Sequence, residues 1–273
     1  MRRVARFLIR TGTFGLLRVS RFVEGVSRAL AFTTFTSGEL DALAVPEWED
    51  FGERGPIVGN ELFGWEQELF ASHVRPSDSI LVAGAGSGRD VLPFLEAGHQ
   101  VTALDIAPGA LATLKDRARR RGRSVATIHA SVVDADLPAA SFDVILFSWF
   151  TFGYIRGSTA RQAALLRSEK ALRPGGRMVV SYPCRVEPGG RRPFVAKLAR
   201  VVARTIGGVE VEPGDEFNVT GTASRPSVFF THHFTDREIE GEVQQAGLHI
   251  LEHTRPAPGV GVLILVRSSQ IRQ

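Results

Sequence analysis

The amino-acid sequence predicts an α/β domain built around a mostly parallel, doubly wound sheet. Between residues 80 and 181, short apolar strands alternate with helical stretches of about ten to fifteen residues, the pattern of strand–helix–strand units. The first strand runs directly into a glycine-rich turn, Gly84 to Gly88, as in sheets that bind nucleotide-like ligands. The 273 residues are 44% hydrophobic and 23% charged, which supplies a sizeable core and excludes a globally disordered chain.

Each element of the sheet follows from a local pattern. A helix begins near Asn60 and ends before Pro76, because the residue before a proline avoids helical geometry. The predicted strands cover residues 80–83, 101–104, 125–129, 144–147, 177–181, 249–253 and 260–266. One predicted helix follows the glycine-rich turn and ends at about residue 97. The other predicted helices cover residues 108–121, 159–172 and 235–246. A Pro174-Gly175-Gly176 turn separates the helix at 159–172 from the fifth strand, and a Thr235–Glu238 capping box opens the last one.

The chain divides into an N-terminal part, residues 1–58, and one domain, residues 59–273. Residues 1–58 are predicted to be a helical arm followed by an acidic, turn-rich connection over residues 33–58. Within the domain, the strand–helix alternation lapses at residues 183–231, which are rich in glycine, proline and arginine and contain one helical piece near 194–206. We expect this stretch to be an insertion that covers a substrate.

The N-terminal arm carries most of the positive charge of the chain. Residues 1–31 contain seven arginines and one acid, Glu24, so the rest of the chain is close to neutral and is not expected to bind nucleic acid. Arginines interrupt every apolar run, which excludes a secretion signal or a membrane span within the arm. Apolar residues between 19 and 30 share one helical face, which predicts a contact with the domain, with a second copy of the chain, or with an anionic membrane surface.

Two motifs near the first two strands indicate a ligand site. Glycines at 84, 86 and 88 allow a sharp turn and a close approach of a ligand to the backbone. A dinucleotide fingerprint would place a third glycine at position 89, where this chain has Arg89. Asp105 ends the second strand, where its carboxylate can accept hydrogen bonds from a ribose diol or cap the following helix. Together with the glycines, the ribose interpretation is favoured.

Six short motifs resemble those of the class I S-adenosylmethionine-dependent methyltransferases. They are Val82–Gly88, Val101–Asp105, Asp134–Pro138, Ser141–Asp143, Leu172–Gly176 and Phe234–Glu238, with Ala246-Gly247 ending the last helix. They occur in the order typical of the family and cover about residues 60–266. The resemblance implies a seven-stranded sheet in the order 3-2-1-4-5-7-6, with the last strand antiparallel, and S-adenosylmethionine as the methyl donor.

The resemblance also implies which residues bind the donor. These are Gly84, Ala85, Gly86, Gly88, Asp105, Ile106, Val132, Asp134 and Ser148. One departure is Val82, because most relatives carry an acidic residue two positions before the first glycine. In this respect the glycine-rich turn is similar to that of the thiopurine and thiol methyltransferase branch.

The acceptor is predicted to be a small molecule. Enzymes that methylate nucleic-acid bases usually carry Asn/Asp-Pro-Pro-Tyr/Phe after the fourth strand, where this chain has Ser148-Trp149-Phe150-Thr151. Trp65, Trp149 and Phe150 are candidates for an apolar wall of the acceptor pocket, although each could equally belong to the core.

Three residues are candidate catalytic groups. His232 and His233 precede the helix after the insertion, and a histidine can take a proton near neutral pH. The alternative for this pair is a structural role in the loop. Tyr154 is the rival candidate and is expected to orient the acceptor through its hydroxyl rather than remove a proton.

The remaining features set the context of this enzyme prediction. Cys184 is the single cysteine, and no cysteine–histidine cluster has metal-ligand spacing, so a reducing, cytoplasmic protein without a metal is expected. A membrane-associated lipid or quinone methyltransferase and a non-catalytic, methyltransferase-like partner subunit are the alternatives. A nicotinamide oxidoreductase fits the glycine spacing less well.

Overall fold

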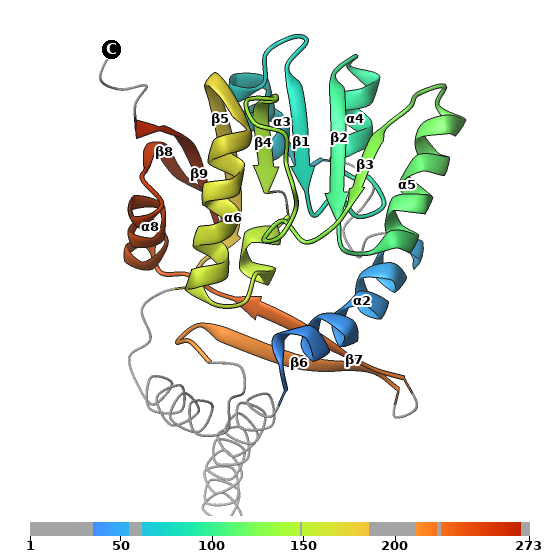
Figure 1. Ribbon diagram of the computed structural model, residues 1–273, viewed down its shortest axis with the longest axis vertical. Helices are drawn as coiled ribbons and strands as arrows, with labels where there is room; N and C mark the ends of the chain where they lie inside the picture. The colour runs from blue at the N-terminus through green and yellow to red at the C-terminus, as the bar shows by residue number, and fades with distance from the viewer. Residues whose placement is uncertain (1–34, 55–61, 148, 186–210, 223–224, 269–273) are drawn as a thin grey trace, which may run out of the picture.

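The computed structural model describes residues 35–54, 62–147, 149–185, 211–222 and 225–268 of the chain (Figure 1). The predicted arm, residues 1–31, and the predicted helical piece near 194–206 lie outside these residues. The helices are α2 (Ser37–Arg54), α3 (Gly64–His73), α4 (Val91–Glu96), α5 (Pro108–Arg120), η1 (a 3-10 turn, Thr151–Tyr154), α6 (Ser158–Ala171) and α8 (Asp236–Gln245). The strands are β1 (Ser79–Ala83), β2 (Gln100–Asp105), β3 (Ala126–His129), β4 (Phe142–Phe147), β5 (Leu172–Pro183), β6 (Asp215–Thr222), β7 (Arg225–His232), β8 (Leu248–Ala257) and β9 (Val260–Arg267).

Seven of these strands form one sheet in the order β3-β2-β1-β4-β5-β9-β8. Strands β1 to β5 pair in parallel, and the last strand, β9, is antiparallel to both β5 and β8. The predicted fold class, strand order and antiparallel last strand are therefore confirmed. β8 and β9 are the sixth and seventh strands of the prediction, since β6 and β7 form a separate sheet.

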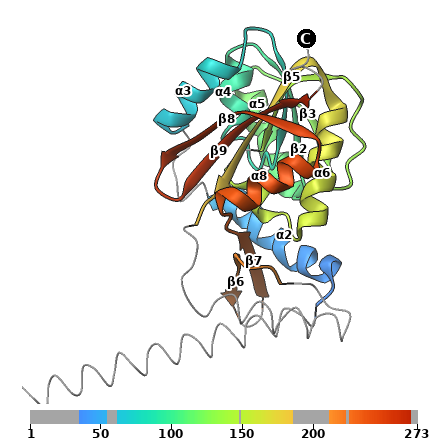
Figure 2. The ribbon, with the colours of Figure 1, turned by 90° about the vertical axis from the view of Figure 1, so that its left-hand side faces the viewer.

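Helices cover both faces of the sheet because its strands are apolar on both sides. In β1, Ile80 and Val82 pack with α3, α4 and α5. The alternate residues Leu81 and Ala83 pack with α6 and α8 on the opposite face. Figure 2 shows these two helical layers on either side of the strands.

The predicted connection at residues 33–58 is wrong in part, because the structure forms helix α2 there. Thr36 and Glu39 begin the helix with a capping box: Glu39 N donates to Thr36 Oγ1 at 3.3 Å, and Thr36 N donates to Glu39 Oε2 at 2.8 Å. The helix continues through Pro46, although proline in a helix interior removes a hydrogen bond. It persists because Leu40 and Ala44 are buried where α2 packs against β7 and α5.

The predicted insertion, residues 183–231, contains a hairpin that the sequence analysis missed. Strands β6 and β7 pair antiparallel, with Asp215 opposite His232 and Thr222 opposite Arg225. Figure 1 shows this hairpin and α2 at the carboxyl ends of β1, β2 and β4. In sheets of this type, ligands bind at the carboxyl ends of the strands.

Candidate functional site

The glycine-rich turn and Asp105 are joined by hydrogen bonds. Gly86 N donates to Asp105 Oδ2 at 2.7 Å, and Ala107 N donates to Oδ1 at 2.8 Å. Burial raises the pKa of Asp105, and the hydrogen bonds from Ala107 and Gly86 oppose that change. Each carboxylate oxygen has a second lone pair, so the same side chain can also accept hydrogen bonds from a ligand. Asp105 thus accepts a hydrogen bond at the start of α5 and also lines the pocket.

Two of the glycines allow close packing, and a third leaves space for a ligand. A Cβ on Gly84 would lie 2.1 Å from Thr151 Oγ1, and one on Gly88 would lie 2.4 Å from Leu114 Cδ1. A Cβ on Gly86 would meet none of the described residues within 4 Å, and φ there is +51°. Gly86 therefore forms an open cradle beside Asp105, as expected of a backbone that a ligand approaches closely.

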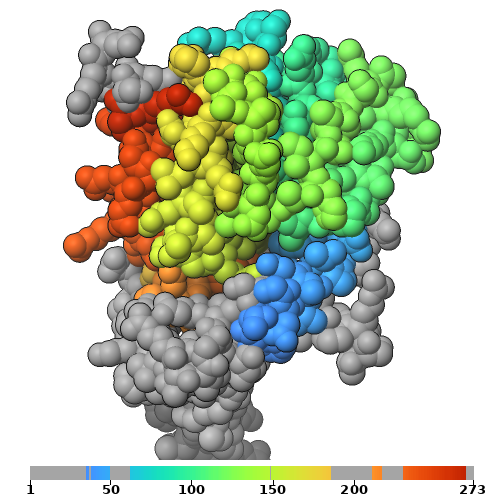
Figure 3. Space-filling view, in the orientation of Figure 1, coloured from blue at the N-terminus to red at the C-terminus, as the bar shows by residue number. Residues whose placement is uncertain are grey.

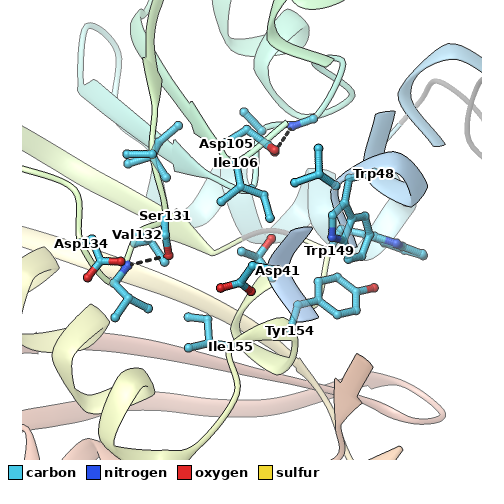
Figure 4. Close-up of a pocket in the computed structure, with 18 of the residues that line it drawn as sticks. Asp41, Trp48, Asp105, Ile106, Ser131, Val132, Asp134, Trp149, Tyr154 and Ile155 are labelled. Carbon is cyan, nitrogen blue, oxygen red and sulfur yellow. Dashed lines mark hydrogen bonds between the residues drawn. The ribbon is translucent and has the colours of Figure 1, made fainter. Parts of the chain in front are cut away.

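These groups line a cavity of about 480 Å³, a volume in the usual range for small-molecule sites (Figure 4). Its wall follows the carboxyl ends of β1 and β2, the segment after β3, and the turn after β4. The lining residues are Asp41, Val45, Trp48, Gly84–Ser87, Arg89, Asp90, Leu104–Ile106, Arg117, Ala130–Asp134, Trp149, Thr151, Tyr154–Arg156 and Ala160. The structure thus brings together most of the residues predicted to bind the donor.

Helix α2 forms one wall of the cavity through Asp41, Val45 and Trp48, which are spaced for one helical face. The ring of Trp48 lies 4.7 Å from that of Tyr154, measured between centroids. Figure 3 shows α2 on the molecular surface. These three residues were not predicted because the acidic, turn-rich composition indicated a connection. Their i, i+4, i+7 spacing was the available signal.

The turn after β4 directs Trp149 into the cavity by an uncommon backbone conformation. Trp149 and Phe150 both have positive φ, at 44° and 64°, which is rare for bulky residues. Phe150 N donates to Ser181 Oγ at 3.2 Å, and the Trp149 ring lies 5.1 Å from the guanidinium carbon of Arg89. Backbone strain of this kind occurs at functional sites more often than elsewhere.

Arg89 occupies the position where a dinucleotide fingerprint has its third glycine. Its guanidinium pairs with buried Glu66, on α3, and with Asp90. It therefore fixes the end of the glycine-rich turn to α3. Arg117, on α5, donates to Ser87 Oγ at 3.1 Å and supports the same turn from the other side.

Several of the predicted site residues do not line the cavity. Trp65 is partly buried against the core on the α3 side of the sheet, and the Phe150 ring packs at a tilt against Trp149. Gly88 serves the packing of α5 described above. His232 and His233 also lie outside the lining, and Ser148 is outside the described residues.

His232 belongs to a buried network of charged groups instead. Its Nδ1 lies 2.6 Å from Asp215 Oδ1, and its Nε2 lies 3.1 Å from Glu238 Oε1. Burial disfavours the imidazolium, but the hydrogen bonds to these carboxylates outweigh it and raise the pKa of His232. In the protonated ring both nitrogens donate to these carboxylates, and that form has no lone pair with which to accept a proton.

Arg161 is the centre of the same network. It is fully buried and donates from Nε to both carboxylate oxygens of Glu242, at 3.0 and 2.9 Å. It also donates to Glu212 Oε2 at 2.7 Å and to the carbonyl oxygen of Ile155 at 3.2 Å. Glu212, Asp215 and His232 offer ligand atoms within 4.8 Å of one another, but Arg161 and His232 already supply the cations that these acids need. We therefore assign the cluster as an ion-pair network.

Comparison with known proteins identifies the domain. Residues 80–176 match the family described as "Methyltransferase domain", which covers the glycine-rich turn, Asp105 and the strands around the cavity. Two structures with the same fold are the CcbJ methyltransferase from Streptomyces caelestis (14% identity, 84% of this chain and 98% of that chain, TM-score 0.60) and a SAM-dependent methyltransferase from Methanosarcina mazei (18% identity, 76% and 98%, TM-score 0.55). Residues 80–176 thus carry a methyltransferase domain, and the fold is that of S-adenosylmethionine-dependent methyltransferases. The predicted family is confirmed, and S-adenosylmethionine is the methyl donor of that family.

Two curated relatives match part of the chain. A malonyl-[acyl-carrier protein] O-methyltransferase from Serratia marcescens is 32% identical over 124 residues, which are 45% of this chain and 43% of that protein. A demethylmenaquinone methyltransferase from Tropheryma whipplei is 30% identical over 136 residues, 49% of this chain and 51% of that protein. The chain thus spans about half the length of the curated relatives it matches.

No helix among the described residues is long and apolar enough to cross a membrane.

Proposed function

We propose that this chain transfers the methyl group of S-adenosylmethionine to a small-molecule acceptor. The observation that carries the proposal is the cavity beside Gly86 and Asp105, at the carboxyl ends of β1 and β2, within the segment that matches the methyltransferase domain. The residues present suit the donor. Gly86 leaves space for it, Asp105 can accept hydrogen bonds from its ribose diol, and Ile106 and Val132 offer apolar contacts to its adenine.

The donor supplies a methyl group already activated on a sulfonium, so the chain's main contribution is alignment and exclusion of water. Helix α2 closes one side of the cavity, and the tilted rings of Trp48 and Tyr154 form an apolar wall there. Burial raises the pKa of the Tyr154 hydroxyl, which suits a group that orients an acceptor and does not remove its proton. No histidine is among the described residues that line the cavity. His232 and His233 are therefore proposed as structural groups.

Calorimetric titration of the full chain with S-adenosylmethionine, and separately with NAD, tests the donor assignment. We expect saturable binding of S-adenosylmethionine with one site per chain and no binding of NAD. Gly86→Leu should abolish binding because it fills the cradle. Gly122→Leu is the matched control, since Gly122 also has positive φ and open space among the described residues but lies outside the cavity. Tight binding of NAD, or equal binding by both variants, would contradict the proposal.

A quinone acceptor is the second candidate, as the alternative of a membrane-associated enzyme anticipated. Two observations favour it: the partial match to a demethylmenaquinone methyltransferase and the amphipathic, arginine-rich arm. Turnover of a soluble quinone analogue, stimulated by anionic vesicles only when residues 1–31 are present, would support this candidate.

A further inference from the structure

An ion pair between Arg156 and Asp41 lies on the acceptor side of the cavity. Arg156 lies in the segment after η1, and Asp41 lies on α2, so the pair joins two separate walls of the cavity. The side chain of Arg156 is 12% exposed, whereas that of Asp41 is 59% exposed. The arginine is therefore the buried partner, and the aspartate is the partner that faces solvent and the open space (Figure 4).

Arg156 is held in place independently of Asp41. Its guanidinium carbon lies 5.8 Å from the centre of the Phe230 ring, on β7. The preceding carbonyl, of Ile155, accepts a hydrogen bond from buried Arg161 at 3.2 Å, and Ser158 N donates to Glu212 Oε1 at 3.1 Å. The Phe230 ring thus contacts the guanidinium, and the backbone on both sides of Arg156 is held by hydrogen bonds that do not involve Asp41.

A buried guanidinium requires an anionic partner, because an uncompensated buried charge is strongly destabilising. Asp41 supplies that anion here. Since its carboxylate is more than half exposed, a ligand carboxylate can replace it at Arg156 with little additional desolvation. An arginine fork matches a carboxylate in two-point geometry, so the exchange preserves the hydrogen bonds.

The surroundings indicate what else such an acceptor carries. Val45, Trp48, Tyr154 and Ile155 line the same side and present apolar and aromatic surface. Two other arginines of the cavity, Arg89 and Arg117, are bonded at the glycine-rich turn, where the donor is proposed to lie. Arg156 is therefore the cation on the acceptor side.

We propose that Arg156 is the specificity-determining residue of the acceptor site and selects a small organic acid with an apolar or aromatic body, exchanging Asp41 for the acceptor's carboxylate. This inference rests on the proposed function. An acceptor that arrives as an anion also suits a cavity next to a cationic donor and without a lining histidine among the described residues.

Three aromatic probes of similar size and different charge test this assignment: benzoate, benzyl alcohol and benzylamine. Each is titrated into the full chain saturated with S-adenosylhomocysteine. We expect benzoate to bind about tenfold or more tightly than benzyl alcohol, the ratio expected for a charge-assisted hydrogen bond. Benzylamine should bind most weakly.

Substitutions test whether Arg156 causes the preference for benzoate over benzyl alcohol. Arg156→Gln should reduce benzoate affinity to that of benzyl alcohol, Arg156→Lys should retain part of the preference, and Asp41→Asn should bind benzoate at least as tightly as the parent. Arg119→Gln is the control, because Arg119 is 78% exposed on α5 and pairs only with Asp116 among the ion pairs of the described residues. It should leave all affinities unchanged. Retained affinity for S-adenosylhomocysteine shows that each variant is folded.

Two kinds of result would overturn the inference. The first is benzylamine binding more tightly than benzoate, or no difference or no binding among the three probes. The second is a loss of S-adenosylhomocysteine affinity in Arg156→Gln, which would assign the guanidinium to the donor's own carboxylate. Failure of the parent chain to bind S-adenosylhomocysteine at all would instead contradict the proposed function.

Discussion

The Asp105 side chain both accepts a hydrogen bond from the glycine-rich turn and lines the donor cavity. Asp105→Ala removes the hydrogen bonds to Gly86 N and Ala107 N as well as those to a ribose diol. We expect S-adenosylhomocysteine affinity to fall by about 1.5–3 kcal/mol, the range for hydrogen bonds to a charged group. Calorimetry measures this change. Unchanged affinity in a folded variant would leave Asp105 only its structural role at the start of α5.

Residues positioned by local sequence were predictable, whereas a residue positioned by distant segments was not. Gly84, Gly86 and Asp105 were predictable because the turn and the strand end that position them are local in sequence. The role of His232 was not, because its carboxylate partners, Asp215 and Glu238, are brought to it by a hairpin and a helix cap. A histidine near the start of a helix has the same sequence pattern whether its ring faces a ligand or a buried acid.

At the scale of elements, Arg161 joins α6, α8 and the segment before β6. Removing its charge leaves Glu242 and Glu212 without the cation that hydrogen-bonds to both of them. Arg161→Met should therefore reduce the free energy of unfolding by about 3–5 kcal/mol, as for a buried ion pair that loses one partner. Denaturant unfolding measures the change. Adding Glu242→Leu to Arg161→Met should restore part of the lost free energy of unfolding, because leucine leaves no unpaired charge in the interior. If the double variant regains no stability, loss of the ion pair is not the cause.

The stabilisation that His232 gives the β6–β7 hairpin should depend on pH. His232, on β7, has a pKa raised above its ordinary value of 6.5 by Asp215 and Glu238, despite its burial. Its contribution to stability is fully present below pH 6.5, where the unfolded chain is also protonated, and is lost as the pH rises through the folded pKa. The stability difference between the parent and His232→Gln should thus be largest in mild acid and decline toward alkaline pH. A difference that grows with pH would contradict this assignment.

The elements that were missed share one physical cause. Helix α2 contains Pro46 and the hairpin lies in a glycine-rich stretch, so local propensity argued against both. Leu40 and Ala44 stabilise α2 through burial against β7 and α5, contacts that join segments far apart in the chain. The central sheet was predictable because its inner strands, such as β1 and β4, are buried apolar runs that follow a turn signal.

For the whole molecule, the role of residues 1–31 stays a prediction. A chain that lacks them should bind S-adenosylhomocysteine as the parent does, because the cavity is built from residues 41–160. It should lose activity or change its oligomeric state, which light scattering measures. Salt-sensitive binding of the full chain to anionic vesicles, absent from the truncated chain, would favour the membrane contact over the protein contact.

The cavity beside Gly86 and Asp105 is proposed to hold the methyl donor. The most direct measurement is a crystal structure of the full chain with S-adenosylhomocysteine. We expect ribose hydroxyls within hydrogen-bond distance of the Asp105 carboxylate, adenine between Ile106 and Val132, and the amino-acid end over Gly84–Gly86. Density for the ligand elsewhere, or an Asp105 carboxylate that contacts only Gly86 N and Ala107 N, would contradict it.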